Sequence, residues 1–337
     1  MRLAFLIMNH RDPAQLMRLV AALRLELPEA PIVVHNDKFR TQIASSALDP
    51  IGNAYLLTSD EPIRWGDFSL VDAFWRSMSW MIEHIEFDWL ILLSAQDYPI
   101  KPCAKLGDYL AATGADVLLR ARPISQLKKG RFRRNKGRRY LYQYRSAATG
   151  WKADELSGNL RPWIRRHMGL FADILNNVQP CLHIYKLSDQ MPWRIGFRAR
   201  STPFTQNEPC CYGSVWISLS RRAAEFVVTT AQERPDYVEY YRRTMHPDES
   251  ATATLVYNAP ELRIEPHDIH HIRWAHSRQG HPDVFVASDL PELLAAPEHE
   301  FFARKFDMAM DAEILDELDR MLARARATSY GASSDGY

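Results

Sequence analysis

The stretch DWLILLSAQDYPIKP, residues 88–102, decides the fold. Its apolar run Trp89–Leu93 is short and continuous, as in a strand whose sheet is covered on both faces. Pro99 and Pro102 cannot donate to a ladder of hydrogen bonds, so the strand has to end here. In open α/β sheets, ligands bind just beyond the carboxyl ends of the strands. The polar residues after the run are therefore either a binding site or an ordinary exit from strand to turn, and both interpretations stay open.

The residues before this stretch predict a parallel sheet. Leu3–Met8 is an apolar run that predicts a first strand, and Ala14–Leu25 carries apolar residues at helical spacing. Pro31–His35 predicts a second strand. A strand, a helix and a strand in such a short length indicate parallel strands joined by a right-handed crossover.

Similar patterns predict the elements that follow, and Ser69 is expected to cap one helix with Asp72 in the capping-box position. The expected strands are 54–57, 116–120 and 215–219. The expected helices are 69–84, 106–113, 163–176, 220–232, one with Asp248 and Glu249 in its first turn, and a closing amphipathic helix. Residues 328–337 are expected to form a disordered tail.

Composition indicates an ordinary globular protein of one large or two modest domains. The chain has 337 residues, of which 46% are hydrophobic and 25% charged. Four cysteines are too few for a disulfide framework and favour a reducing compartment. The apolar run at the amino terminus is too short for a signal peptide or a membrane span. We therefore expect a cytoplasmic protein, which could lie at the inner face of the membrane.

Positive charge is concentrated between Arg120 and Arg145, where no acidic residue occurs. Two interpretations of this segment remain open. It could be a solvated loop face, or a patch that faces an anionic substrate, lipid headgroups or nucleic acid.

Several familiar motifs do not occur. The sequence contains no Gly-rich dinucleotide loop, P-loop or serine nucleophile elbow. The histidines between His267 and His281 and the pair Cys210–Cys211 do not match the spacing of common metal sites. We therefore expect neither a cofactor nor a metal.

Seven stretches together resemble the core-2/I-branching β-1,6-N-acetylglucosaminyltransferase family, glycosyltransferase family 14, which includes the peptide O-xylosyltransferases. In order they are AFLIMNHRDPAQLMRLVAAL, IVVHNDK, RWGDFSLVDAFW, DWLILLSAQDYPIKP, GSVWISLSRRAAEFV, HPDESATATLVYNAP and FFARKFD. They cover about residues 3–310, although 121–205 carries no family signature. The chain is most similar to a bacterial-type member.

The resemblance implies a GT-A-type α/β fold, with a mainly parallel central sheet flanked by helices. It implies a single catalytic domain over 1–327, made of a nucleotide-binding half (1–120), a variable basic insertion on the acceptor side (121–210) and a half with the base and the diphosphate site (211–327). It also implies inverting, metal-independent transfer from a UDP-sugar. The strand end agrees with this, because SAQD holds one carboxylate where metal-dependent sugar transferases of this type carry two.

The resemblance also implies roles for individual residues. Glu249 in HPDES matches the family's base, which takes the proton of the acceptor hydroxyl. Lys305 in FFARKFD matches a lysine that binds the diphosphate of the leaving group. Asp248 is interpreted as a helix cap. The other residues implied at the UDP-sugar site are Asp37, Trp65, Gly66, Ser94, Gln96, Asp97, Tyr98, Gly213, Ser214, Arg273, Arg278 and Arg304.

The implied donor sugar is N-acetylglucosamine or xylose, and the acceptor is a glycan, a lipid-linked glycan or a protein. Contact with an anionic membrane through residues 120–145 is a further expectation, and nucleic acid is not an expected partner. The alternative function is a non-catalytic protein that binds nucleic acid or an anionic membrane through the same basic segment.

Overall fold

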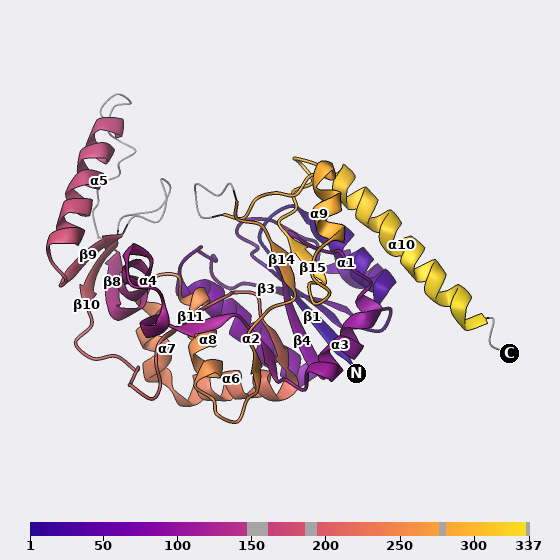
Figure 1. The fold of residues 1–337 in the computed structure, drawn as a ribbon, viewed down its shortest axis with the longest axis horizontal. Coiled ribbons are helices and arrows are strands. Elements are labelled where there is room, and N and C mark those ends of the chain that lie inside the picture. The colour runs from indigo at the N-terminus through magenta and orange to yellow at the C-terminus, as the bar shows by residue number, and fades with distance from the viewer. Residues whose placement is uncertain (147–160, 186–193, 276–280, 335–337) are drawn as a thin grey trace.

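The structure is a computed structural model that describes residues 1–146, 161–185, 194–275 and 281–334. Its central sheet has seven strands in the order β13-β6-β12-β4-β1-β2-β3 (Figure 1). Only β12 runs antiparallel to its neighbours, so the expected α/β fold with a mainly parallel central sheet is confirmed. The strands are β1 (Leu3–Asn9), β2 (Ile32–Asn36), β3 (Ala54–Thr58), β4 (Trp89–Ser94), β6 (Val117–Leu118), β12 (Ser218–Ser220) and β13 (Ile264–Glu265).

Helices cover both faces of this sheet. Successive side chains of a strand point to opposite faces, so Phe5 and Leu6 of β1 are buried in two different apolar clusters. The first cluster is closed by α1 (Pro13–Glu26), α3 (Leu106–Thr113) and α10 (Glu313–Ser334). The second is closed by α2 (Phe68–His84), α6 (Arg221–Glu233), α7 (Pro235–Arg242) and α8 (Ala251–Tyr257). This two-sided burial explains the continuous apolar runs of the strands.

The expected cap of α2 is wrong by two residues. The carboxylate of Asp67 accepts the backbone N–H of Ser69 at 3.2 Å, so the helix begins at Phe68. The hydroxyl of Ser69 instead accepts the N–H of Arg64 at 2.9 Å. Asp72 pairs with Arg76, one turn along the helix, at 2.7 Å.

The carboxyl ends of the central strands meet at one edge. Asn9 of β1 lies opposite Asn36 of β2, and its amide donates to the Asn36 side-chain oxygen at 2.7 Å. Ser94 at the end of β4 lies opposite Met8 of β1. Polar residues that are far apart in the sequence therefore share the edge where α/β sheets bind ligands.

The apolar run of residues 89–93 ends because the chain turns into a second, three-stranded sheet. β5 (Asp97–Pro99) pairs with β15 (Phe302–Arg304), which pairs with β14 (His270–Ile272). In this register Asp97 lies directly opposite Arg304. The FFARKFD segment is thereby fixed beside the end of β4.

Part of the basic segment is a helix rather than a solvated loop. Residues 131–141 form α4 (Arg131–Leu141), which buries Lys136 and Tyr140. The chain continues through β8 (Tyr142–Ser146), α5 (Arg161–Val178), β9 (Leu182–Tyr185) and β10 (Arg194–Arg198). These strands form a separate sheet in the order β8-β10-β9. Figure 1 shows this sheet and α5 at the end of the molecule opposite α10.

Three further expectations need correction. α10 continues to Ser334, so most of the expected disordered tail is helical. Asp248 and Glu249 lie in a separate 3-10 turn, Pro247–Glu249, before α8. The strands expected at 116–120 and 215–219 shorten to β6 and β12.

The remaining elements are β7 (Ala121–Pro123), β11 (Cys211–Gly213) and α9 (Leu290–Leu294). Among the described helices, none has the length and apolar character that a membrane span requires.

Candidate functional site

Glu249 lies in a nest of positive charge formed by α4. Its Oε2 accepts hydrogen bonds from Lys136 Nζ at 2.7 Å, from Arg139 at 2.6 Å and from the Tyr140 hydroxyl at 3.3 Å. Burial alone would raise the pKa of Glu249, but the charges of Arg139 and Lys136 outweigh it and the pKa is lowered. The carboxyl group is therefore ionised at neutral pH. Its Oε1 forms no hydrogen bond with any residue that the structure describes, which leaves this oxygen for a ligand.

Asp248 has a different environment from its neighbour and does not cap a helix. α8 has no side-chain cap, and the Oδ1 atom of Asp248 is buried without a partner among the described residues. Burial, followed by the charge of Glu249, raises the pKa of Asp248 to about 7. The pKa values of the two adjacent carboxyl groups are thus shifted in opposite directions, and Glu249 is the group that stays charged at neutral pH.

Trp65 links Glu249 to the strand edge. The Gly66 carbonyl accepts the backbone N–H of His246 at 3.0 Å, which holds the Trp65 loop against the turn before Glu249. The Trp65 ring lies 4.7 Å from the His246 ring and 5.6 Å from the His281 ring. The Trp65 side chain is partly exposed, so a ligand can reach it.

Lys305 lies in a cluster of cations at the strand edge. Crowding by surrounding protein, followed by the charges of Arg40, Arg11, Arg304 and Lys305, lowers the pKa of His10 to about 4. Burial, then Lys305 and Arg304, also lowers the pKa of His281, which contacts Trp65. His281 therefore lies within electrostatic reach of the cluster and in contact with Trp65. We call the region from Glu249 past Trp65 to Lys305, at the carboxyl ends of the strands, the crevice.

The ammonium group of Lys305 is open to a ligand. Burial, then the charges of Arg304 and Arg11, lowers its pKa, and Asp307 opposes this. Asp307 is itself paired with Arg11 at 2.8 Å. Within the described part of the chain, no hydrogen bond or ion pair engages the Lys305 ammonium. A half-buried cation surrounded by other cations is a favourable partner for a phosphate group.

Ser94 and Asp97 hold Arg304 in place. The Arg304 guanidinium donates to Asp97 at 2.8 Å and to the Ser94 hydroxyl, and it lies 4.3 Å from the Trp216 ring centre. Asp97 also accepts the Ser94 backbone N–H at 2.6 Å. Burial would raise the pKa of Asp97, but Arg304, His270 and this N–H lower it overall. Asp97 is therefore a charged anchor for Arg304.

Two other residues predicted at the UDP-sugar site, Asp37 and Gln96, support the backbone around the crevice. Asp37 is fully buried, and its two oxygens accept the backbone N–H groups of Phe39 at 3.1 Å and Ile63 at 3.2 Å. The Gln96 side chain donates to the Phe306 carbonyl at 3.3 Å, which braces the Lys305 segment.

Gly213 and Ser214 belong to the packing beneath the crevice. A Cβ atom at Gly213 would lie 2.9 Å from the Ala253 Cβ and 3.0 Å from the Arg120 carbonyl, so only glycine fits without movement. The Ser214 hydroxyl accepts the N–H of Trp216 at 3.1 Å, and the Trp216 ring underlies Arg304.

Two residues predicted at the UDP-sugar site, Tyr98 and Arg273, are bound to carboxylates of other elements. Tyr98 donates its hydroxyl to Asp319 of α10 at 2.6 Å. Arg273 forms a two-pronged pair with Asp289 at 2.8 Å and also contacts Glu292 at 2.7 Å. These carboxylates neutralise Arg273, so it is a less favourable partner for a diphosphate than Lys305, and its role there stays a prediction. Arg278 lies outside the described residues.

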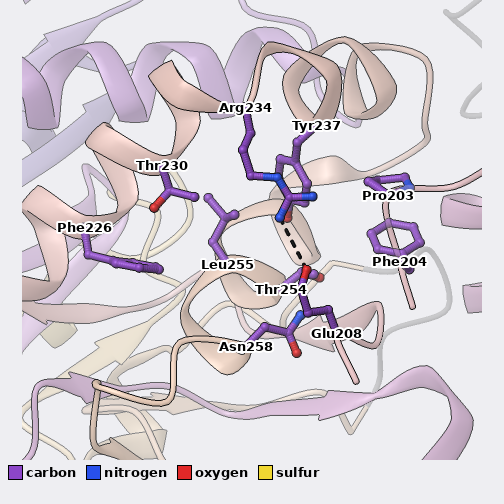
Figure 2. Close-up of a pocket in the computed structure, with 10 residues that line it drawn as sticks. All are labelled: Pro203, Phe204, Glu208, Phe226, Thr230, Arg234, Tyr237, Thr254, Leu255 and Asn258. Atoms are coloured by element: carbon purple, nitrogen blue, oxygen red, sulfur yellow. Dashed lines mark hydrogen bonds and ion pairs between the residues drawn. The ribbon is translucent and has the colours of Figure 1, made fainter. Parts of the chain in front are cut away.

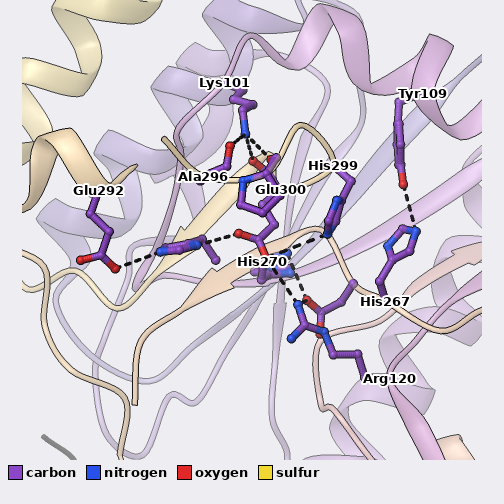
Figure 3. A network of polar contacts seen from close by, with 12 residues as sticks. Lys101, Tyr109, Arg120, His267, His270, Glu292, Ala296, His299 and Glu300 are labelled. Atoms are coloured by element: carbon purple, nitrogen blue, oxygen red, sulfur yellow. Dashed lines mark hydrogen bonds and ion pairs between the residues drawn. The ribbon is translucent and has the colours of Figure 1, made fainter. Parts of the chain in front are cut away.

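A polar network supports the Arg304 strand from the side (Figure 3). Arg120 contacts Asp268 at 3.3 Å and Glu300 at 3.5 Å, and His271 contacts Glu300 at 2.6 Å. These pairs connect β14 with the residues just before β15. The network therefore fixes the sheet that carries Arg304.

Sequence reasoning missed five residues of the crevice: His10, Arg11, Arg40, Lys136 and Arg139. The first two follow β1 directly, in Asn-His-Arg-Asp, at the carboxyl end where ligands bind. Their position after the first strand could have identified them as candidate ligand-binding residues. No comparable signal marked the two cations of α4, because their partner Glu249 is more than a hundred residues away.

A separate small pocket holds none of the predicted residues. It has a volume of about 130 Å³ and is lined by residues of α6, α7, α8 and the preceding loop (Figure 2). An ion pair between Arg234 and Glu208, at 3.4 Å, crosses it. Neither Glu249 nor Lys305 is among the residues that line it.

Comparison with known proteins shows the family to which the chain belongs. The family described as core-2/I-branching enzyme matches residues 3–155 and 176–294. A xylosyltransferase of Ciona intestinalis is 27% identical, over 76% of this chain and 26% of that protein. Xylosyltransferase oxt of Drosophila pseudoobscura pseudoobscura is 24% identical, over 98% and 34%. Beta-glucuronosyltransferase GlcAT14A of Arabidopsis thaliana is 25% identical, over 70% and 43%. The chain thus spans less than half the length of these relatives.

The environment of Asp248 predicts a pH-dependent effect on stability. Its pKa is raised from 3.8 to about 7, so its contribution is favourable at low pH and is lost as the pH rises through 7. Asp248→Asn removes this titration. We expect the variant's gain in free energy of unfolding, relative to the wild type, to grow by about 2–3 kcal/mol between pH 5 and pH 8.

Urea denaturation at both pH values measures this difference. Asp49→Asn, at an exposed carboxylate, is the matched control and should show no such growth. A gain for Asp248→Asn that does not change with pH would contradict the assignment.

Proposed function

Because the chain belongs to the core-2/I-branching enzyme family, we propose that it transfers a sugar from a UDP-sugar to an acceptor hydroxyl. The transfer inverts the anomeric centre and needs no metal. The sugar is xylose, which the names of several relatives support, or N-acetylglucosamine. The acceptor is a glycan, a lipid-linked glycan or a protein. The observation that carries the proposal is an ionised carboxylate, Glu249, and an open lysine, Lys305, linked through the contacts of Trp65 with His246 and His281.

Glu249 is the proposed general base. Inversion by a single displacement needs a carboxylate that accepts the proton of the attacking hydroxyl. Lys136 and Arg139 keep Glu249 ionised, but they also weaken it as a base. Proton transfer to Oε1 is therefore expected late, when the hydroxyl oxygen is already bonding to the anomeric carbon and has become more acidic.

Lys305 is the proposed partner of the departing diphosphate. As the bond to the sugar breaks, negative charge develops on the β-phosphate, and a cation fixed in advance stabilises it without reorganising. Arg11 and Arg40 add positive charge nearby. Arg304 is shared with Asp97, so it supports Lys305 more than it binds the phosphate itself.

The donor's other parts would meet Trp65 and the Asp37 loop. The partly exposed indole of Trp65, between Glu249 and Lys305, offers an apolar face to the sugar ring. Asp37 is buried and bonded to backbone N–H groups, so we propose that it shapes the loop beside the nucleoside.

The base assignment predicts a specific loss of turnover. Glu249→Gln keeps the shape and an oxygen for Lys136 and Arg139, but it cannot accept a proton. General-base catalysis contributes about 10²–10⁴-fold, so turnover should fall at least about 100-fold while UDP affinity stays near that of the wild type. UDP release with a donor and an acceptor, together with calorimetry of UDP, measures both. The exposed Glu298→Gln is the control, and normal turnover in a folded Glu249→Gln protein would remove Glu249 from this role.

The lysine assignment predicts a loss confined to the phosphates. Lys305→Ala should weaken UDP binding by about 1.5–3 kcal/mol, the range for charge-assisted hydrogen bonds, and should leave uridine binding unchanged. Calorimetry with both ligands measures the difference, with the exposed Lys105→Ala as the control. Equal losses for UDP and uridine would indicate a structural role, and no loss for either would place Lys305 outside the site.

The cation cluster also predicts that activity survives chelation. If Lys305 and its neighbours neutralise the diphosphate, turnover in excess EDTA should match that of the untreated protein. A fall to background that manganese reverses would sink the metal-independent mechanism.

A further inference from the structure

Charge is strongly segregated along the chain. The protein has 42 Lys and Arg against 41 Asp and Glu, so its net charge is only +1. Fifteen of these cations but only three of the acids lie within residues 120–178, which include α4 and α5. The rest of the chain therefore has an excess of acid. A region this basic on a nearly neutral protein is suited to an anionic partner.

One side of α5 exposes large apolar side chains. Leu170, Phe171, Ile174 and Val178 are exposed by 53%, 62%, 63% and 77%. At 100° per residue these four positions fall within about 100° of one another, so they share one face of the helix. We call these four residues the α5 apolar face. Contiguous exposed apolar residues of this size mark a surface that binds something.

The opposite side of α5 is well packed, so the helix is held with this face outward. Ala172 and Asn176 are buried. The Asn176 side chain donates to the Ile184 carbonyl of β9 at 2.9 Å and accepts the N–H of Ile184 at 2.8 Å. These contacts turn the apolar face of this part of α5 away from β9.

The basic helix α4 is joined directly to α5. The Arg138 guanidinium donates to the Asn176 carbonyl, and the Tyr142 hydroxyl donates to the Pro180 carbonyl just after α5. Five further cations of this part are exposed: Lys128, Lys129, Arg131, Arg134 and Arg145. The elements that carry the apolar face and these cations, α5, α4 and β8, thus lie together at the end of the molecule opposite α10 (Figure 1).

We propose that this part docks on the surface of an anionic lipid bilayer, with the α5 apolar face inserted among the lipids. Membrane-surface helices combine an apolar face with positive charge that attracts anionic headgroups. Nucleic acid would use the cations but offers no apolar phase for four exposed aliphatic and aromatic side chains. A second copy of the chain would bring two strongly basic regions together. The proposal does not depend on the proposed enzymatic function.

Flotation with vesicles tests the proposal without donor or acceptor. The protein should float with vesicles of phosphatidylcholine and phosphatidylglycerol, and much less with phosphatidylcholine alone. Phe171→Ser with Ile174→Ser should lower partitioning into the anionic vesicles about ten-fold or more, because two inserted side chains are lost. Arg131→Ser with Arg134→Ser should lower it as well, more strongly at low salt.

Matched substitutions separate insertion from general stickiness. Leu25→Ser with Met310→Ser changes two apolar residues that are equally exposed elsewhere, and it should leave partitioning unchanged. Circular dichroism checks that every variant is folded. The proposal is overturned if anionic vesicles bind no better than neutral ones, or if the α5 and control variants behave alike. It is also overturned if the α5 variants change only self-association, or only binding to RNA.

Discussion

The buried ion pair between Asp97 and Arg304 is the contact on which the crevice depends. It joins the end of β4 to β15, two segments about two hundred residues apart, at the edge where the central strands end. Losing one partner of a buried pair leaves an uncompensated charge, at a cost of about 3–5 kcal/mol. The polar residues after the apolar run of β4 therefore serve to hold the FFARKFD segment, and with it Lys305, beside β1 and β2.

At the other end of the crevice an ion pair also fixes the site, but there the group available to a ligand is an anion. There a carboxylate, Glu249, is held by two cations from α4. Each end thus keeps one charged group available, the Oε1 atom of Glu249 and the ammonium group of Lys305, next to a pair that fixes its position. Trp65 spans the space between them. A base and a cation kept apart in this way suit a reaction that takes a proton at one end and releases an anion at the other.

Local pattern predicted the sheet and most helices, but it did not predict α4. β1, α1, β2 and β4 bury apolar side chains at regular spacing, and such periodicity is visible in the sequence. The inner face of α4 includes Lys136, Arg139 and Tyr140, which all bond to Glu249 from a distant turn. A helix whose inner face is largely charged shows no apolar periodicity in its sequence.

The candidate site shows the same limit. Motif matches identified Glu249 and Lys305, which are open on one side, but adjacency in sequence cannot show which way a side chain points. Tyr98 follows Asp97 yet turns to Asp319, and Arg273 is taken up by Asp289. In each case the deciding partner comes from another element, so only the folded chain reveals it.

The position of UDP in a crystal of the complex tests the central claim most directly. The account predicts β-phosphate oxygens about 3 Å from Lys305 Nζ, with the sugar side of the diphosphate directed along Trp65 towards Glu249. A complex with the diphosphate on Arg273, or with UDP outside the crevice between Lys305 and Glu249, would contradict it.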